Sequence, residues 1–319
     1  YFRNEVAAYS TGVPWDTVWA IHQWAIVPEI LPFYRAMDDS LLACATVIAQ
    51  EPGYWREPLP VRRAQFFSQV LREYLPVKIL DGELIVGSQF NTALSKSHTE
   101  KEGKKYRKKV DKWAKKLKKL NDLGYGNCGA VPGHLIPNYR KVLKVGFSGL
   151  AGEIEEELAS GRDGSRRDNL CAMLECCQAV PELTMRYAAK ADALAAHEEG
   201  AARREELMEI ARICRRTPWE PPETLHEALQ ALWFTHMLIM SAESYPGPGV
   251  SFGRIDQYLY PYFEKDVEAG RLSRDQAKEL LMCFFIKPNY AYDYQGRVGA
   301  NQGINSGFGQ LITLSGCGP

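Results

Sequence analysis

The clearest periodic pattern along the chain lies between residues 100 and 120. Apolar side chains recur there at intervals of four, three, four and three residues, at Tyr106, Val110, Trp113, Leu117 and Leu120. This spacing places them on one face of a helix, so it predicts a helix with a single apolar stripe. The other faces are basic, because residues 101–119 hold ten lysines and one arginine but only two acidic side chains.

Most of the remaining chain also has a helical pattern. Residues 1–75 predict short helices that are rich in aromatic side chains and separated by prolines. Further helices are predicted at residues 152–158, 168–197, 202–216 and 223–240, from about residue 255, and from the Ser273 cap to about residue 286. Three prolines between residues 217 and 222 separate two of these helices, because proline cannot supply the amide donors of a helix interior.

Two segments have the pattern of β-strands instead. Residues 76–87 contain two β-prone runs on either side of Asp81-Gly82, which predicts a hairpin or a strand. Residues 296–318 hold seven glycines and include the strand-like run 309–315. Together with the helical segments, these runs predict a helix-rich α/β fold.

The composition limits the classes of function. The 319 residues are 45% hydrophobic and 24% charged, with 39 basic and 39 acidic side chains and no formal net charge. Binding of nucleic acid is therefore disfavoured, and we interpret the lysine-rich segment as a solvated helix face rather than an RNA site. The longest apolar run, residues 231–240, is too short to cross a membrane, and no secretory signal is visible, so we expect a cytoplasmic protein.

Side chains with catalytic potential are few. The eight cysteines contain no Cys-x-x-Cys pair, so we expect reduced thiols and no metal site. The chain has no nucleophile elbow and no glycine-rich turn that opens a dinucleotide fold. His134 follows a glycine- and proline-rich turn from which a histidine can reach into a cleft, and Arg254 precedes Asp256, with which it is expected to pair. The residues by themselves assign no catalytic group.

Several blocks of sequence, taken together, resemble the glycyl radical enzymes of the pyruvate formate-lyase family. The blocks are residues 81–88, 133–139, 210–215, 223–230 and 251–262, and they keep the order of that family. The resemblance implies an α/β fold in which residues 1–319 are the N-terminal part only of a pyruvate formate-lyase-type domain. That part is the N-terminal half of the family's ten-stranded α/β barrel.

The resemblance also implies an enzyme that works with an organic radical. In this family a glycyl radical is installed by a radical-SAM activating enzyme, and a cysteine thiyl radical then removes a hydrogen atom from the substrate. Both radical residues are expected beyond residue 319, so neither Cys317 nor Arg297-Val298-Gly299-Ala300 is assigned to them. As in the family, we expect a homodimer that takes a small-molecule substrate and binds no cofactor directly.

The resemblance further suggests residues that contact the substrate. His134 matches the position at which dehydratases of the family hold a substrate hydroxyl. Glycerol-type dehydratases also carry a His-Ser pair where this chain has Pro248 and Gly249. A polyol dehydratase is therefore less favoured, because a site that binds hydroxyls should keep its hydrogen-bonding side chains. Tyr245 and Phe252 suit a less polar substrate.

A carboxylate on the substrate would have two candidate partners, Arg254 and Arg297, which can bind it through two parallel hydrogen bonds. The favoured function is therefore a radical lyase or decarboxylase acting on a small carboxylate-bearing, possibly aromatic compound. One alternative is a glycyl radical dehydratase or C–N/C–S lyase on a small polar substrate. Another is a non-catalytic scaffold or anion-binding protein derived from the fold.

Overall fold

The computed structural model describes residues 40, 43–88, 94–124, 135–161, 163–242, 250–298, 312 and 314. The long helices within this part of the chain are α4 (Leu59–Gln69), α5 (Glu100–Asp122), α6 (Tyr139–Ala159), α7 (Gly164–Ala195), α8 (Ala201–Arg216), α9 (Leu225–Ala242), α10 (Ile255–Glu268) and α11 (Arg274–Val298). Shorter helical turns lie at Tyr54–Arg56, Val70–Tyr74 and Leu94–Ser97. The helices predicted after residue 160 are confirmed, whereas the one predicted at 152–158 is only the end of the longer α6.

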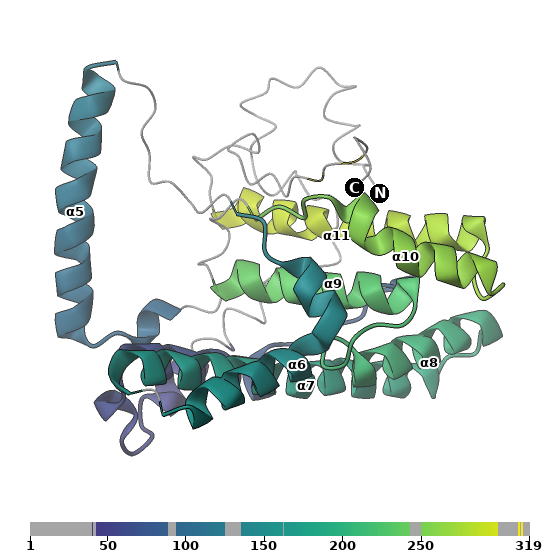
Figure 1. The fold of residues 1–319 in the computed structure, drawn as a ribbon, viewed down its shortest axis with the longest axis horizontal. Helices are drawn as coiled ribbons and strands as arrows, with labels where there is room; N and C mark the ends of the chain where they lie inside the picture. The colour runs from purple at the N-terminus through teal and green to yellow at the C-terminus, as the bar shows by residue number, and fades with distance from the viewer. Residues whose placement is uncertain are drawn as a thin grey trace.

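The helices stack in layers around α9 (Figure 1). Helices α4, α6 and α8 pack on α7 and form one side, and α10 and α11 pack on α9 from the other. No helix among the described residues is long and apolar enough to cross a membrane. The described part of the chain is therefore a helical stack with one central helix.

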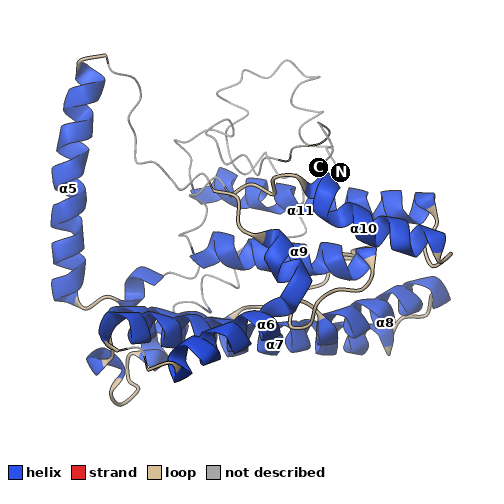
Figure 2. Ribbon diagram, viewed as in Figure 1, coloured by secondary structure: helices blue, strands red, loops and turns tan. Residues whose placement is uncertain are grey.

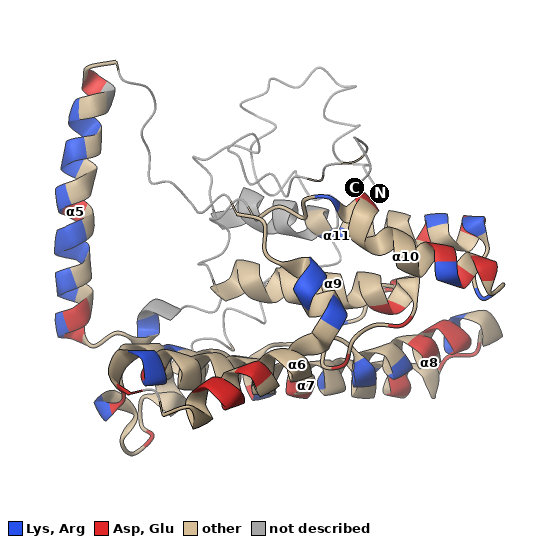
Figure 3. Ribbon diagram, in the orientation of Figure 1, with Lys and Arg blue, Asp and Glu red and all other residues tan. Residues whose placement is uncertain are grey.

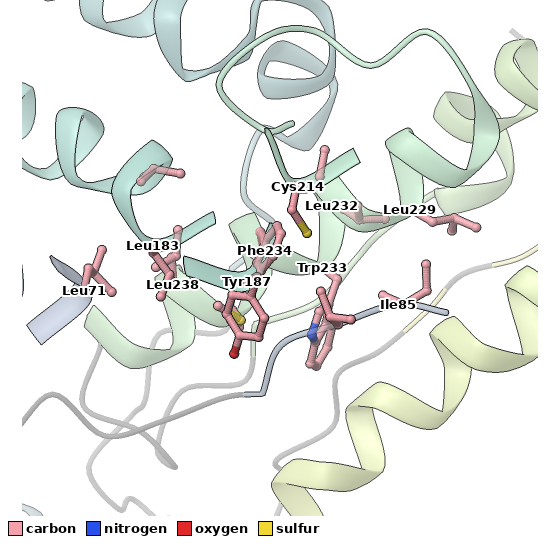
Figure 4. Packing of buried hydrophobic residues seen from close by; sticks show 14 of the residues in the cluster. Leu71, Ile85, Leu183, Tyr187, Cys214, Leu229, Leu232, Trp233, Phe234 and Leu238 are labelled. Atoms are coloured by element: carbon pink, nitrogen blue, oxygen red, sulfur yellow. The ribbon is translucent and has the colours of Figure 1, made fainter. Parts of the chain in front are cut away.

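Helix α9 occupies the centre because most of its side chains are apolar and its buried polar ones have hydrogen-bond partners. Trp233, Phe234 and Met237 are fully buried, and Figure 4 shows Trp233 and Phe234 in the same cluster as Tyr187 of α7 and Cys214 of α8. A helix that is hydrophobic around most of its circumference is stable only inside a core. Its position explains why so many elements of the fold contact it.

The N-terminus of α9 is capped by buried carboxylates. Thr224 and Glu227 form a reciprocal capping box, in which the Glu227 amide donates to Thr224 Oγ1 over 3.2 Å and the Thr224 amide donates to Glu227 Oε2 over 3.3 Å. Asp266 of α10 accepts a further hydrogen bond of 2.7 Å from the Leu225 amide. These bonds satisfy amides that a buried helix start would otherwise leave without partners.

The β structure predicted from the sequence is only partly present. The described residues contain no regular strand (Figure 2) but do contain two isolated parallel bridges, Leu135 to Val250 and Gly253 to Ile312. The hairpin or strand predicted at residues 76–87 does not form: a turn lies at Leu80–Glu83, but its two arms do not pair with each other and neither is a regular strand. The ten-stranded barrel half is not confirmed.

The arm after this turn is held by side chains of α9 in place of a neighbouring strand. Gln230 accepts from the Val86 amide over 2.8 Å and donates to the Val86 carbonyl over 2.9 Å. Trp233 Nε1 donates to the Gly87 carbonyl over 3.0 Å, and His226 Nε2 donates to the Leu84 carbonyl over 2.8 Å. Buried backbone groups must be paired, and here one helix face supplies the partners that a sheet would normally supply.

Helix α5 stands apart from the stack (Figure 1). It confirms the helix predicted between residues 100 and 120, but its apolar stripe is not covered, since Tyr106 is 63% and Trp113 61% exposed. The lysines are exposed too, as expected for a solvated face, and Figure 3 shows that basic residues, in blue, follow one another along this helix. An amphipathic helix usually buries its stripe, so this exposed stripe is unusual.

Candidate functional site

Three segments that are far apart in the sequence meet at the two parallel bridges. Leu135 pairs with Val250, with a hydrogen bond of 3.0 Å from the Ser251 amide to the Leu135 carbonyl, and Gly253 pairs with Ile312. The loop of residues 250–254 therefore lies between the segment that starts at Leu135 and the segment around Ile312. Irregular loops held beside a rigid helical frame are common places for binding residues.

The loop of residues 250–254 has a tightly fixed backbone. The Tyr258 hydroxyl donates a hydrogen bond of 2.9 Å to the Phe252 carbonyl. Gly253 has a φ of 68°, and a Cβ at this position would lie 2.9 Å from Ile136 Cγ2. The left-handed backbone conformation favours glycine at this position, and a larger residue would also have to displace the Ile136 side chain.

A buried aromatic cluster lies beneath this loop. The Phe252 ring stacks on the His236 ring with a centroid distance of 4.0 Å, and the Tyr139 and Trp233 rings lie 6.1 and 5.8 Å from His236. The Tyr139 oxygen is 2.7 Å from His236 Nδ1. Burial raises the pKa of Tyr139 well above its usual range, so this hydroxyl stays protonated.

Arg254 lies at the surface end of the loop. Its guanidinium donates two hydrogen bonds, of 2.9 and 2.8 Å, to the two carboxylate oxygens of Asp256, and this pairing raises the pKa of Arg254. The expected ion pair is confirmed. The side chain is 31% exposed, so it is also accessible from solvent.

Arg254 also borders a cleft of about 850 Å³ between α6 and α10. The cleft combines three cationic side chains with three tyrosines and is lined by Arg140, Lys144, Arg254, Tyr258, Tyr260 and Tyr262, among others. Cations beside aromatic walls suit an anionic group attached to an apolar one.

The structure describes only two of the five side chains that were predicted to contact the substrate. Phe252 is fully buried and Arg254 is partly exposed, although only one residue separates them. Arg297 lies near the end of α11, but its side chain is outside the described part of the molecule, as are His134 and Tyr245. The residue after His134, Leu135, is the one that pairs with Val250. The segments that contain His134 and Phe252 thus lie beside each other, but the described part of the chain does not bring the five side chains into one site.

Several cysteines among the described residues are buried thiols with raised pKa values. No three His, Cys, Asp or Glu side chains in this part of the chain are grouped closely enough to hold a metal ion. The described cysteines are free thiols, and burial raises the pKa of Cys44 and of Cys176 to about 12 and that of Cys177 to about 11. A protonated, buried thiol is neither a good nucleophile nor a good ligand.

A buried ion pair was not foreseen from the sequence. Lys287 of α11 donates a hydrogen bond of 2.6 Å to Glu83, and the two side chains are 2% and 8% exposed. The only sequence signal was the position of Glu83 among apolar residues in the run 83–86, and the partner is 204 residues away. The ammonium also lies 5.8 Å from the Trp233 ring centroid, so the pair contacts the same helix that supports the loop.

The described part of the chain is a helical frame with two parallel bridges between loops at its edge. A model of the pyruvate formate lyase-like family matches residues 94–318, so the chain belongs to that family. The solved glycyl radical enzyme of Archaeoglobus fulgidus superimposes with a TM-score of 0.60 at 29% identity, covering 79% of this chain and 38% of that one. The predicted family is confirmed.

Curated relatives indicate the kinds of lyase in this neighbourhood. An isethionate sulfite-lyase of Oleidesulfovibrio alaskensis is 40% identical over 157 residues, which is 47% of this chain and 19% of the relative. A trans-4-hydroxy-L-proline dehydratase of Clostridioides difficile is 37% identical over 164 residues, 50% of this chain and 20% of the relative. The matched half of the chain thus spans about a fifth of the length of these relatives.

Proposed function

We propose that this chain is the N-terminal part of a glycyl radical lyase that eliminates a hydroxyl or sulfonate group from a small polar substrate. The observation that carries the proposal is the similarity to a sulfite-lyase and to a dehydratase at 40% and 37% identity. The first name describes the loss of sulfite from a substrate, and the second describes the loss of water. The function favoured from the sequence was a radical lyase or decarboxylase acting on a small carboxylate-bearing, possibly aromatic compound. These two relatives agree with a lyase but do not specifically support decarboxylation, and the alternative of a dehydratase or C–N/C–S lyase fits them better.

The chain's own residues would provide the frame and part of the substrate wall. The glycyl radical, carried by residues that we place beyond residue 319 and installed by an activating enzyme, would supply the hydrogen-atom chemistry. Residues 250–254 would form a rigid wall, because Tyr258 and the Phe252–His236 stack hold them in one conformation. A wall that does not reorganise keeps water out and orients the substrate.

Individual roles follow from position and chemistry. His134 would contact a hydroxyl or sulfonate oxygen, supported by the pairing of the next residue, Leu135, with the loop. Arg254 or Arg297 would bind an anionic substrate group, with Asp256 orienting the Arg254 guanidinium.

Tyr245 would form part of the apolar wall of the site, and Phe252 would hold the loop in place from below. A homodimer remains the expected assembly.

The experiment is anaerobic activation of the complete protein that contains this chain, together with its radical-SAM activating enzyme. Electron paramagnetic resonance counts the glycyl radical, and isethionate, trans-4-hydroxy-L-proline and phenylacetate then serve as substrates. We expect elimination from a hydroxylated or sulfonated substrate. Carbon dioxide release from phenylacetate without any elimination would instead establish the decarboxylase.

Site variants of the same activated protein test the residues. His134→Ala should leave the radical yield unchanged and lower kcat/KM about tenfold or more, because the contact acts on the substrate and not on activation. Arg254→Gln should raise KM, provided that the substrate is anionic. Arg167→Gln is a suitable control, since Arg167 is an exposed arginine in the first turn of α7.

A further inference from the structure

Within the described part of the chain, helix α5 is anchored at its first turn. Thr99 and Glu102 form a capping box, and the buried Arg62 of α4 donates to the same Glu102 carboxylate over 2.5 Å. Arg62 is fixed in turn by the carbonyls of Ser97 and Glu57, at 3.1 and 2.9 Å. Beyond this anchor the helix makes no substantial contact with the other described helices. It therefore projects from the stack in a defined direction (Figure 1).

The projecting helix carries an uncovered apolar seam, which consists of Tyr106, Val110, Trp113, Leu117 and Leu120. Four of the five are exposed by between 42% and 63%, and Leu117 is half-buried. At 100° per residue the five side chains span about 80° of the helix circumference. Their alternating spacing of four and three is the core pattern of a coiled coil, which is narrower than the stripe of a helix that lies on a globular core.

The flanks of this seam are basic. Lys109 and Lys116 directly precede Val110 and Leu117, in the positions that face a partner's flanking residues in a coiled coil, and Arg107 borders the other side. Residues 101–119 carry eleven cationic side chains and only two carboxylates. A second α5 would bring two such strongly positive helices together, so charge disfavours pairing with another copy of this chain.

We infer that α5 is a docking element for an acidic amphipathic helix of a partner protein. The partner would place aliphatic side chains in the seam and glutamate or aspartate opposite Lys109 and Lys116. An anionic bilayer is less well matched, because a helix that embeds in a membrane surface presents a broader apolar face. Single-stranded RNA is less well matched because only two of the five seam side chains, Tyr106 and Trp113, are aromatic, and Lys116 already lies 4.7 Å from the Trp113 ring centroid.

The test uses the 319-residue chain and two synthetic three-heptad peptides, measured by fluorescence anisotropy of the labelled peptide. Both peptides have leucine at the core positions, and their flanking positions are all glutamate in one and all lysine in the other. We expect the glutamate peptide to bind at least about tenfold more tightly than the lysine peptide, with weaker binding at high salt. Equal affinity for the two peptides would overturn the inference.

Three double variants separate the seam from simple charge attraction. Val110→Ser with Leu117→Ser should weaken binding of the glutamate peptide about tenfold or more, because the core contacts are lost. Lys109→Glu with Lys116→Glu should reverse the preference in favour of the lysine peptide. Lys108→Glu with Lys115→Glu changes the charge equally, at the same spacing, on the opposite face, and should alter affinity by less than about threefold.

Several outcomes would contradict the inference. Equal losses in the two lysine variants would show charge attraction without a seam. Seam-dependent self-association, or seam-dependent binding to vesicles of phosphatidylcholine and phosphatidylglycerol at about 7:3, would identify a second copy or a membrane as the occupant. Circular dichroism of each variant confirms that α5 remains helical, so that a loss of binding is not a loss of structure.

Discussion

Tyr139 and His236, 97 residues apart in the sequence, meet inside the aromatic cluster, with the tyrosine oxygen 2.7 Å from Nδ1 of the histidine. Tyr139 opens α6 and His236 lies in the middle of α9. The contact therefore ties the segment that follows His134 to the central helix, directly beneath the loop of residues 250–254. Because both rings also contact Phe252, this one hydrogen bond helps to set the position of the proposed substrate wall.

Tyr139→Phe should destabilise the protein by about 1–3 kcal/mol, because it removes the hydroxyl and leaves a buried ring nitrogen poorly satisfied. Urea unfolding monitored by circular dichroism measures the change in the free energy of unfolding. Tyr106→Phe on α5 is the control and should change stability by less than about 0.5 kcal/mol, since Tyr106 is 63% exposed. Equal effects of the two substitutions would show that the buried contact contributes nothing.

Gly146 should not tolerate alanine. It interrupts α6 with a φ of 66°, and a Cβ there would lie only 2.2 Å from the Trp219 carbonyl oxygen. The interruption lets the Phe147 and Ser148 amides donate to the carbonyls of Pro218 and Trp219, both over 2.9 Å. Gly146→Ala should therefore cost about 2–5 kcal/mol through backbone strain and the clash.

The matched control for this prediction lies in the same helix. Gly152 has open space around its Cα, so Gly152→Ala should stabilise the protein by about 0.5–1 kcal/mol by reducing the freedom of the unfolded chain. Thermal and urea unfolding of both variants give the comparison. A neutral Gly146→Ala would mean that α6 can straighten without losing its contact with the Pro218–Trp219 segment.

Gln230→Leu should destabilise the protein by about 2 kcal/mol or more. The substitution leaves the buried amide and carbonyl of Val86 without the partner that now satisfies both. Gln178→Leu on the exposed face of α7 is the control for the same change of side chain and should lie within about 0.5 kcal/mol of the wild type. If Val86 found a strand partner in the full-length protein, Gln230→Leu would be tolerated.

The contrast between α5 and residues 76–87 shows how far the sequence predicts this fold. The periodicity of α5 identified the helix, because a helix is made by contacts between near neighbours. It could not show whether the seam is covered, since that depends on elements elsewhere. The β-prone run around Val86 contains no signal for Gln230, 144 residues away, which takes the place of a strand. Local pattern thus predicts element type, whereas pairing partners are a property of the tertiary structure.

The candidate site was predicted in the same uneven way. The Arg254–Asp256 pair follows from their closeness in sequence, and the family resemblance located the loop. The His236–Phe252 stack joins α9 to the loop that it supports. Neither sequence segment contains a pattern that predicts the other as its partner. His236 reads as an ordinary core residue of an apolar helix, and only the fold shows that it lies under the proposed wall.

The anchor of α5 should be sensitive to acid. Hydrogen bonds from Arg62 and Thr99 lower the pKa of Glu102 from 4.5 to about 2. Because the unfolded chain binds this proton more readily than the folded chain, the contribution of Glu102 to stability is present above pH 4.5 and is lost as the pH falls to about 2. The difference in free energy of unfolding between wild type and Glu102→Gln should therefore shrink over this range.

Urea unfolding at several pH values measures that difference. Glu100→Gln is the control, because Glu100 is exposed and pairs only with the exposed Lys104 among the ion pairs of the described chain. Its difference from wild type should stay nearly flat over the same pH range. A flat profile for Glu102→Gln would show that Arg62 does not hold the carboxylate in solution.

Breaking the Lys287–Glu83 pair from one side should be far more damaging than removing both charges. Lys287→Met leaves the Glu83 carboxylate buried without its cation and should cost about 3–5 kcal/mol. Glu83→Gln with Lys287→Met removes both charges and keeps an acceptor for the Leu80 amide, which now donates to Glu83 over 2.7 Å, so it should recover most of the loss. Unfolding measurements on the two single variants and the double variant give the coupling energy directly. A double variant as unstable as Lys287→Met would show instead that the lysine stem, packed beside Trp233, matters more than its charge.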